Sequence, residues 1–176
     1  MNPEPAPGPL GIREADVGDT DPIVRLVRDC TGGMRAAGIE QWDEVYPDRA
    51  TIAADIGSRS AFVAAHQGEL VGMVVLNEHQ DPEYADVPWT CLGRPAVVHR
   101  LMVAPPWEGR GVGRALVQFV ERRALAQGYG CIRLDAFSEN PRALRLYEGS
   151  GYRRVGRVRF RKGLFDCFEK PLLRAG

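Results

Sequence analysis

The sequence predicts an α/β domain in which helices flank a single mixed sheet of mostly antiparallel strands. Apolar, β-branched runs alternate along the chain with segments of helical periodicity. The central part reads strand, helix, strand, helix, and the C-terminal part reads as a hairpin. At 176 residues the chain is long enough to form one domain with a substantial core.

Each predicted strand is a short apolar run bounded by turn-forming residues. The predicted strands cover residues 10–14, 60–66, 69–77, 97–103, 131–136, 152–160 and 167–172. Gln67 and Gly68 form the turn of the first hairpin, and Lys162 and Gly163 form that of the last. The polar segment 78–95 shows no periodicity, and loops of this length are typically functional or mobile.

Four helices are predicted from periodic apolar residues and from capping residues at their ends. The first follows Asp21 and Pro22, and we expect Gly32 and Gly33 to break or loosen it. Pro47 opens a second, short helix. The other two helices belong to the two motifs described below.

The composition argues against several classes of partner. Basic and acidic residues balance at 23 each, so nothing indicates nucleic acid or an anionic membrane. The four cysteines and three histidines are scattered, so we expect no metal site and a reducing, cytoplasmic location. The longest hydrophobic run, residues 70–76, is too short to span a bilayer. The oligomeric state stays open, with a homodimer among the alternatives.

The N-terminal residues 1–9 differ in composition from the rest of the chain. They carry four prolines and have neither the basic nor the apolar region of a signal peptide. We therefore expect a disordered tail over residues 1–9 and a single domain over residues 10–173.

A glycine-rich segment lies between the predicted strand 97–103 and a helix with i, i+3, i+4 apolar spacing. Its residues are Gly109, Arg110, Gly111, Val112, Gly113 and Arg114. Glycine lets a backbone approach a ligand closely, and the free N–H groups of a helix N-terminus favour a phosphate or pyrophosphate. A dinucleotide-binding fingerprint would require glycine where Leu116 stands, and a P-loop would require Gly-Lys-Ser/Thr.

This stretch resembles motif A of the GNAT acyltransferase superfamily, whose loop follows the pattern Gln/Arg-x-x-Gly-x-Gly/Ala. Gly111 and Gly113 match the two small residues of that pattern. The hydrophobic-x-Val-x-Pro lead-in matches Leu101, Val103 and Pro105. Glu108 stands where the family has Gln or Arg. This difference puts the role of the side chain at position 108 in doubt, but it does not affect the backbone cradle that follows. An ordinary glycine-rich turn is the competing interpretation of this motif alone.

A second motif supports the same resemblance. Residues 140–152 read N-P-R-A-L-R-L-Y-E-G-S-G-Y, similar to the superfamily's Asn-x-x-Ala-x-x-Leu-Tyr-Glu-x-x-Gly-Phe signature. Asn140 is a suitable N-cap, Pro141 suits the first helical position, and Gly151 ends the helix. The resemblance covers most of the chain, about residues 10–172.

The resemblance implies a GNAT fold, in which two central parallel strands splay apart and leave a slot for the pantetheine arm of acetyl-CoA. The backbone expected to pair with pantetheine is that of Leu101, Met102 and Val103. The resemblance further implies that residues 109–114 hold the pyrophosphate and that Asn140 contacts the pantetheine arm. Tyr147 is implied to contact the cofactor and to act as the general acid toward the departing sulfur. A core tyrosine with a satisfied hydroxyl is the alternative.

The acceptor pocket is less well defined by the sequence. In the superfamily, acceptor specificity comes from the early helices and the mid-chain loop. The candidate substrate residues are Trp42, Tyr46, Glu78, Tyr84, Trp89 and His99. Ordinary aromatic packing, a solvated acid at Glu78 and a core position for His99 are the competing interpretations. A chain of water molecules could also replace a side-chain general base.

We therefore expect an acetyl-CoA-dependent N-acetyltransferase that acts on a primary amine of a small molecule or protein. Direct attack in a ternary complex is expected, because no cysteine is paired with a base in the pattern of an acyl-enzyme. The alternative is a non-catalytic sensor or regulatory module that binds CoA or acyl-CoA. A nucleotide-binding domain of another fold is disfavoured by the incomplete glycine fingerprint.

Overall fold

The computed structural model describes residues 9–173, whose strands form one mixed sheet in the order β1-β2-β3-β4-β5-β7-β6. The strands are β1 (Gly11–Glu14), β2 (Ala61–His66), β3 (Glu69–Asn77), β4 (Pro95–Val103), β5 (Cys131–Phe137), β6 (Arg153–Phe160) and β7 (Gly163–Pro171). Among them only β4 and β5 pair in parallel. The predicted fold class is confirmed. The predicted tail, residues 1–9, lies outside the described residues except for Pro9.

The described helices are α1 (Thr20–Ala36), α2 (Arg49–Gly57), α3 (Val112–Ala126) and α4 (Pro141–Gly149), joined by 3-10 turns η1 (Val17–Asp19), η2 (Pro82–Asp86) and η3 (Pro105–Trp107). Asn140 caps α4 as predicted, because its side chain accepts from the Ala143 N–H at 3.1 Å. For α2 the prediction is off by two residues. Asp48 rather than Pro47 marks the start, since its carboxylate accepts from the Thr51 N–H at 2.8 Å.

The prediction for α1 was wrong at both ends of the helix. The helix begins at Thr20, one residue before Asp21, because Asp16 closes a capping box that starts the preceding turn η1. It also runs through Gly32 and Gly33 without a break, and neither glycine has a positive φ. Gly33 packs so closely on η3 that an added Cβ would lie 3.2 Å from Pro105 Cγ. The glycine pair therefore serves packing rather than a turn.

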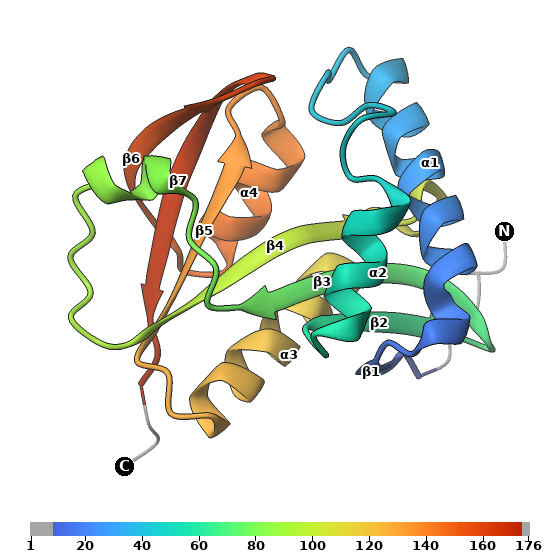
Figure 1. The fold of residues 1–176 in the computed structure, drawn as a ribbon, viewed down its shortest axis with the longest axis horizontal. Helices are drawn as coiled ribbons and strands as arrows, with labels where there is room; N and C mark the ends of the chain where they lie inside the picture. The colour runs from blue at the N-terminus through green and yellow to red at the C-terminus, as the bar shows by residue number, and fades with distance from the viewer. Residues whose placement is uncertain (1–8, 174–176) are drawn as a thin grey trace, which may run out of the picture.

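Two cores lie on opposite faces of the sheet. Helices α3 and α4 cover one face with residues such as Leu116 and Tyr147, which pack against Phe168 of β7. Helices α1 and α2 cover the β1–β4 half of the other face, where Ile23 and Ile52 meet the strands. Figure 1 shows α1 and α2 on the near side of the sheet and α3 behind it. The sheet is thus covered on both sides.

The segment 78–94 covers the β5–β7 half of the second face, which α1 and α2 leave open. Its turn η2 buries Tyr84 in a third cluster with Val97 of β4 and Phe137 of β5. Further along, the Thr90 N–H donates to the buried carboxylate of Glu169 at 3.0 Å. This long segment is therefore anchored in the core.

The central parallel strands separate soon after they pair. The β4–β5 ladder comprises Pro95↔Cys131, Ala96↔Ile132 and Val97↔Arg133, and no pair follows it among the described residues. Figure 1 shows β4 running across the sheet while β5 rises away from it. The splayed strands expected from the resemblance are therefore present, and they leave a slot that connects the two faces.

Candidate active site

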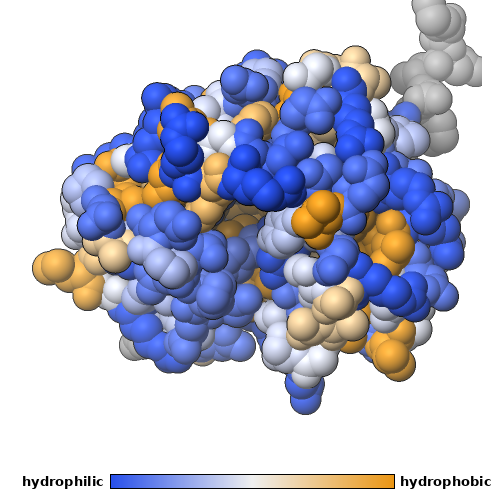
Figure 2. All heavy atoms as spheres, turned by 45° about the horizontal axis from the view of Figure 1, so that its top comes forward, coloured by the Kyte–Doolittle hydropathy of each residue, from blue (hydrophilic) through white to orange (hydrophobic). Residues whose placement is uncertain are grey.

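The slot between β4 and β5 opens into a cavity of about 1180 Å³. Residues from both faces line it, among them Tyr147 from the α4 side and Asp135 and His99 from the α1–α2 side. Figure 2 shows a hollow with hydrophobic residues at its floor and hydrophilic residues around its rim. A cavity of this size and character can hold a ligand of cofactor dimensions.

One part of the cavity, here called the glycine end, consists of residues 101–114 and the start of α4 (residues 140–142). Gly109 and Gly111 have φ values of 73° and 85°, in the left-handed region that favours glycine. An added Cβ at either position would have no atom within 4 Å, so this surface is open to a ligand. Gly111 is the N-cap of α3, so the first N–H groups of that helix face the same space. This backbone geometry is compatible with the predicted phosphate cradle.

Strand β4 forms the adjoining wall. Leu101, Met102 and Val103 line the cavity, beyond the last residue of β4 that pairs with β5. Against β3, the strand carries one extra residue between His99 and Met102, and Arg100 in this bulge has a φ of 47°. The bulge turns the strand where it enters the slot.

The remaining residues of the predicted cradle have different surroundings. Gly113 packs against α4, where an added Cβ would lie 3.2 Å from Leu146 Cδ2. The Val112 side chain is buried in the core and does not line the cavity. Arg114 lines the cavity, whereas Arg110 stacks its guanidinium 5.5 Å from the Trp107 ring centre. Neither arginine forms an ion pair within residues 9–173, so both keep their charge available.

Glu108 forms an ion pair, and Asn140 forms a hydrogen bond in addition to its predicted cap, that sequence reasoning did not anticipate. Glu108 pairs with Arg142, so this ion pair joins the glycine-rich segment to the first turn of α4. Asn140 caps α4 through its oxygen and donates through Nδ2 to Gln41 Oε1 at 2.9 Å. The Asn140 amide thus links α4 to the segment after α1.

Tyr147 reaches the cavity from the buried face of α4. Its ring packs edge-on against Tyr152 at 5.8 Å between ring centres. Its hydroxyl makes no hydrogen bond within the described residues. Burial raises the pKa of Tyr147 above its ordinary value, so the hydroxyl keeps its proton near neutral pH. The hydroxyl is therefore a free donor at the slot.

The other part of the cavity, here called the carboxylate end, contains Asp81, Asp135, His99, Arg100 and Tyr46. Asp135 lies on β5 and accepts a 2.6 Å hydrogen bond from the Tyr84 hydroxyl. Burial raises the pKa of Asp135 to about 6, near the range that suits a general base. Sequence reasoning missed Asp135. Its signal was a lone carboxylate between two core residues, Leu134 and Ala136, of a central strand.

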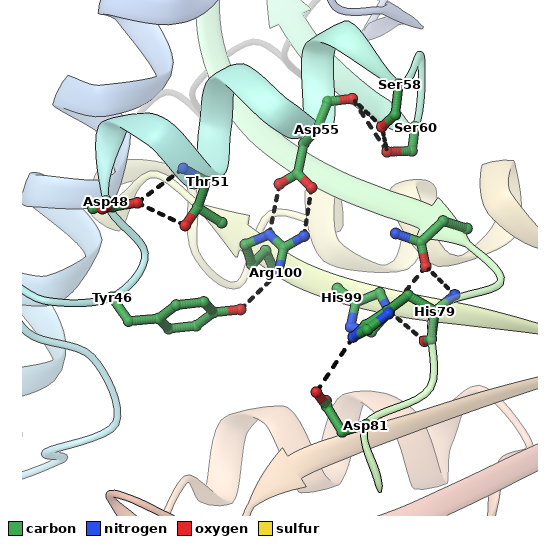
Figure 3. Close-up of polar contacts among 11 residues, drawn as sticks. Tyr46, Asp48, Thr51, Asp55, Ser58, Ser60, His79, Asp81, His99 and Arg100 are labelled. Carbon is green, nitrogen blue, oxygen red and sulfur yellow. Dashed lines mark hydrogen bonds and ion pairs between the residues drawn. The ribbon is translucent and has the colours of Figure 1, made fainter.

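His99 lies beside this carboxylate end but is electrically neutral. Its Nε2 lies 3.1 Å from both the Asn77 side-chain oxygen and the His79 carbonyl oxygen. Both partners are acceptors, so Nε2 carries the ring proton. Burial lowers the pKa of His99 to about 4. Figure 3 shows His99 and His79 side by side, with Asp81 next to His79.

Arg100 connects the β4 bulge to two other elements. Its guanidinium forms a bidentate pair with the buried Asp55 of α2, at 2.5 Å and 2.6 Å. It also donates to the Tyr46 hydroxyl at 2.6 Å, as Figure 3 shows. This network fixes Tyr46 at the cavity wall. No motif in the sequence pointed to the pairing of residues 45 positions apart.

The predicted substrate residues divide into two groups. Trp42, Tyr46 and His99 line the cavity. Glu78 does not, because it pairs with Arg94 and accepts from the Tyr129 hydroxyl on the outer surface. Tyr84 and Trp89 also lie outside the lining. They stack on each other, with ring centres 5.1 Å apart, and Tyr84 reaches the cavity only through Asp135.

Two further features bear on the class of protein. Within residues 9–173, no group of three or more His, Cys, Asp or Glu side chains is arranged to hold a metal ion. No helix in the described part of the chain has both the length and the apolar character needed to cross a membrane.

Comparison with known proteins gives relatives of one kind. Thialysine N-epsilon-acetyltransferase of Bos taurus is 27% identical over 146 residues, which cover 80% of this chain and 82% of that protein. Mycothiol acetyltransferase of Frankia alni is 35% identical over 91 residues, or 52% of this chain. The chain spans only 27% of the Frankia protein, and it spans 30% of a zebrafish N-acetylaspartate synthetase.

Solved structures show the same fold. A GNAT family acetyltransferase from Streptococcus agalactiae superposes with a TM-score of 0.83 at 22% identity, covering 94% of this chain and 96% of that one. The ribosomal-protein-S18-alanine N-acetyltransferase of Escherichia coli has a TM-score of 0.71 at 16% identity, covering 96% and 97%. The model of the acetyltransferase (GNAT) family matches residues 23–152, which contain both sequence motifs and most of the cavity wall. The chain therefore belongs to the GNAT acetyltransferase family.

Proposed function

We propose that this protein transfers an acetyl group from acetyl-CoA to a primary amine by direct attack within a ternary complex. The observation that carries the proposal is one cavity lined by an open glycine cradle, a free tyrosine hydroxyl and a half-buried carboxylate. Acetyl-CoA would supply the activated thioester. Residues of this chain would bind and orient acetyl-CoA and the amine, and would accept and donate the protons.

The glycine end fits the phosphates and pantetheine of CoA. Gly109 and Gly111 leave the backbone bare at the N-terminus of α3, where N–H groups favour an anion. Arg114, and Arg110 beside it, would add positive charge. The unpaired edge of β4 at Leu101 and Val103 offers backbone groups to an extended amide chain, as an added strand would use them. A donor on this edge could also stabilise negative charge on the thioester oxygen.

Asp135 is the residue that we assign as the general base. An amine arrives mostly as ammonium near neutral pH and must lose a proton before its nitrogen can attack. With a pKa of about 6, Asp135 is mostly ionised at pH 7 yet basic enough to accept that proton. Tyr84 holds the carboxylate through its 2.6 Å hydrogen bond. His99 is a weaker candidate, because its pKa of about 4 makes it a poorer base.

Tyr147 is the residue that we assign as the general acid. When the carbon–sulfur bond breaks, the electron pair stays on sulfur, and the Tyr147 hydroxyl can donate its proton to it. Cys30 also lines the cavity, but it is unsuited to an acyl-enzyme route. Burial raises the pKa of its thiol to about 12, and the thiol lies 3.2 Å from the Val103 carbonyl oxygen. A protonated thiol is a poor nucleophile, which supports direct attack.

The acceptor is a separate question. The names of the relatives mention mycothiol, thialysine and a ribosomal-protein alanine, which are chemically different groups. What these activities share is acetyl transfer. For this chain the relatives therefore support a primary amine as the acceptor and no particular compound.

A thermal-shift panel with acetyl-CoA, CoA, NAD and ATP tests the first half of the proposal. A ligand at a hundred times its dissociation constant adds about 2.7 kcal/mol, a shift on the order of 5–10 °C for a chain of this size. We expect shifts with acetyl-CoA and CoA alone. A shift with NAD or ATP instead would contradict the assignment of the glycine end.

The second half of the proposal, acetyl transfer to an amine, is tested by measuring the release of free thiol from acetyl-CoA in the presence of a panel of amines. Tyr147→Phe should lower kcat by about 10²-fold, because it removes only the proton donor. Tyr152→Phe is the matched control, since Tyr152 is buried beside Tyr147 but does not line the cavity. CoA binding without transfer to any amine would favour the sensor alternative.

A further inference from the structure

The charges at the carboxylate end are unevenly compensated. Three basic side chains that line the cavity, Arg100, Arg161 and Lys162, already have a carboxylate close by. Arg100 pairs with Asp55 at 2.5 Å, and Arg161 pairs with Asp43 at 2.9 Å. Lys162 also approaches Asp43, at 3.5 Å. None of these cations is free to bind an anionic group of a substrate.

The two acids of the carboxylate end, Asp81 and Asp135, lack comparable partners. Asp135 accepts a hydrogen bond from the neutral Tyr84 hydroxyl, and within residues 9–173 no basic side chain pairs with it. Asp81 has only the His79 imidazole nearby, with Nε2 at 3.4 Å from Oδ1. The neighbouring His99 is neutral. The two carboxylates also sense each other, because the charge of Asp81 contributes to the raised pKa of Asp135.

The walls around these acids suit a cation. Trp42, Tyr46, Phe160 and Phe165 line the cavity, and the negative faces of such rings attract ammonium groups. An anionic acceptor would meet two carboxylates at this end. The cavity-lining arginines that form no ion pair within residues 9–173, Arg114 and Arg145, come from α3 and α4 on the other face of the sheet. A monocation would neutralise only one of the two acids.

From these contacts we infer that the acceptor is a small amine with a second cationic group, such as an aliphatic diamine. Asp135 receives the reacting amine, and Asp81 holds the distal ammonium. The inference rests on the proposed function and names the substrate class of the same site. The reaction itself is unchanged: an N–C bond forms and the C–S bond breaks. Of the two protons that the ammonium nitrogen loses, one passes to Asp135, and the other restores the Tyr147 hydroxyl after its proton has passed to the departing sulfur.

Three amines of equal backbone length test this inference: 1,4-diaminobutane, butylamine and 4-aminobutanoate. They differ only in the distal group, which is cationic, neutral or anionic. We expect kcat/KM to fall about tenfold or more from the diamine to butylamine, and further to the amino acid. A series of longer diamines then locates the best span between the two carboxylates.

Asp81→Asn should lower the ratio of kcat/KM for the diamine to kcat/KM for butylamine about tenfold, because the distal ammonium loses its partner. Glu83→Gln is the control, because Glu83 is an exposed acid of the same turn that does not line the cavity. Equal kcat/KM for the three amines, or a preference that survives Asp81→Asn, would overturn the inference. A peptide N-terminus acetylated better than any diamine would overturn it as well. No transfer to any amine, with CoA still bound, would instead contradict the proposed function.

Discussion

The glycine end and the carboxylate end of the cavity are built in different ways. The glycine end comes from one continuous stretch of chain, β4 through α3, plus the first turn of α4. It presents mainly backbone, and its shape follows from glycines with positive φ. The carboxylate end assembles side chains from separate segments, among them Tyr46, Asp81, Arg100 and Asp135. The comparison teaches that the first end is local in sequence and the second depends on the fold.

The largest effect is expected from a substitution that disables the carboxylate end and leaves the glycine end intact. Asp135→Asn should lower kcat by about 10²–10⁴-fold while leaving the affinity for CoA nearly unchanged, because the base is lost but the cradle is not. In the wild type, kcat/KM should rise with pH through the pKa of about 6 and then level off. Steady-state rates between pH 5 and 8.5 check both points. If Asp135→Asn keeps the wild-type kcat, or if its kcat/KM still rises with pH near 6, Asp135 is not the base.

The same substitution has a predicted effect on stability. The pKa of Asp135 is raised from 3.8 to about 6, so the folded state holds a proton that the unfolded state has lost. Its contribution to stability is therefore complete below about pH 4 and is lost as the pH rises through 6. Asp135→Asn should raise Tm at pH 8, and this gain should shrink toward pH 4. A Tm difference that does not change with pH would contradict this account.

The next effect breaks the glycine end alone. Gly111→Ala places a methyl group at a φ of 85° and into the open cradle, so the Kd for CoA should rise about tenfold. Gly128→Ala is the control, because Gly128 has a φ of 82° and equally open surroundings just after the other end of α3. Both variants should lose about 1–2 kcal/mol of stability, but only Gly111→Ala should lose affinity. Equal CoA affinity in the two variants would argue against the cradle.

Arg100→Met tests how firmly the carboxylate end is held. It leaves the buried Asp55 without its partner and should lower the free energy of unfolding by about 3–5 kcal/mol. Arg49→Met breaks a pair with Asp21 whose side chains are 62% and 66% exposed, and it should cost less than about 1 kcal/mol. Urea unfolding of both variants gives the comparison. Similar losses would mean that the buried network contributes little.

The smallest expected effect concerns Glu108, the unusual acid of the glycine end. Glu108→Gln removes a negative charge beside the proposed phosphate site, so CoA should bind about two- to fivefold more tightly at low salt. The gain should fade as the ionic strength rises. Calorimetric titrations at two salt concentrations provide the check. Weaker binding of CoA would instead show that the Glu108–Arg142 pair supports the cradle.

The fold could be predicted largely because its signals are local. Strand alternation, the cap at Asn140 and the glycines around Gly111 each act within a few residues. The unbroken course of α1 could not be predicted, because Gly33 is needed for close packing against Pro105, which lies far along the chain. Distance along the chain also explains why the sequence suggested Glu78 as a pocket residue. Its position outside the cavity depends on contacts with Arg94 and Tyr129, which are remote in sequence.

The same reasoning separates the two ends of the site. Tyr147 could be proposed from the sequence because it lies within a motif. Asp135 was missed because its role depends on Tyr84, which is 51 residues away, and on the burial that raises its pKa. A lone acid in a core strand is the pattern that could have pointed to it.

The most direct test of the division between the two ends is a calorimetric titration of CoA into the wild type, Gly111→Ala and Asp135→Asn. The account predicts that Asp135→Asn binds CoA as the wild type does, whereas Gly111→Ala binds it about tenfold more weakly. Equal affinities for all three proteins, or a loss confined to Asp135→Asn, would contradict the assignment of the glycine end to CoA.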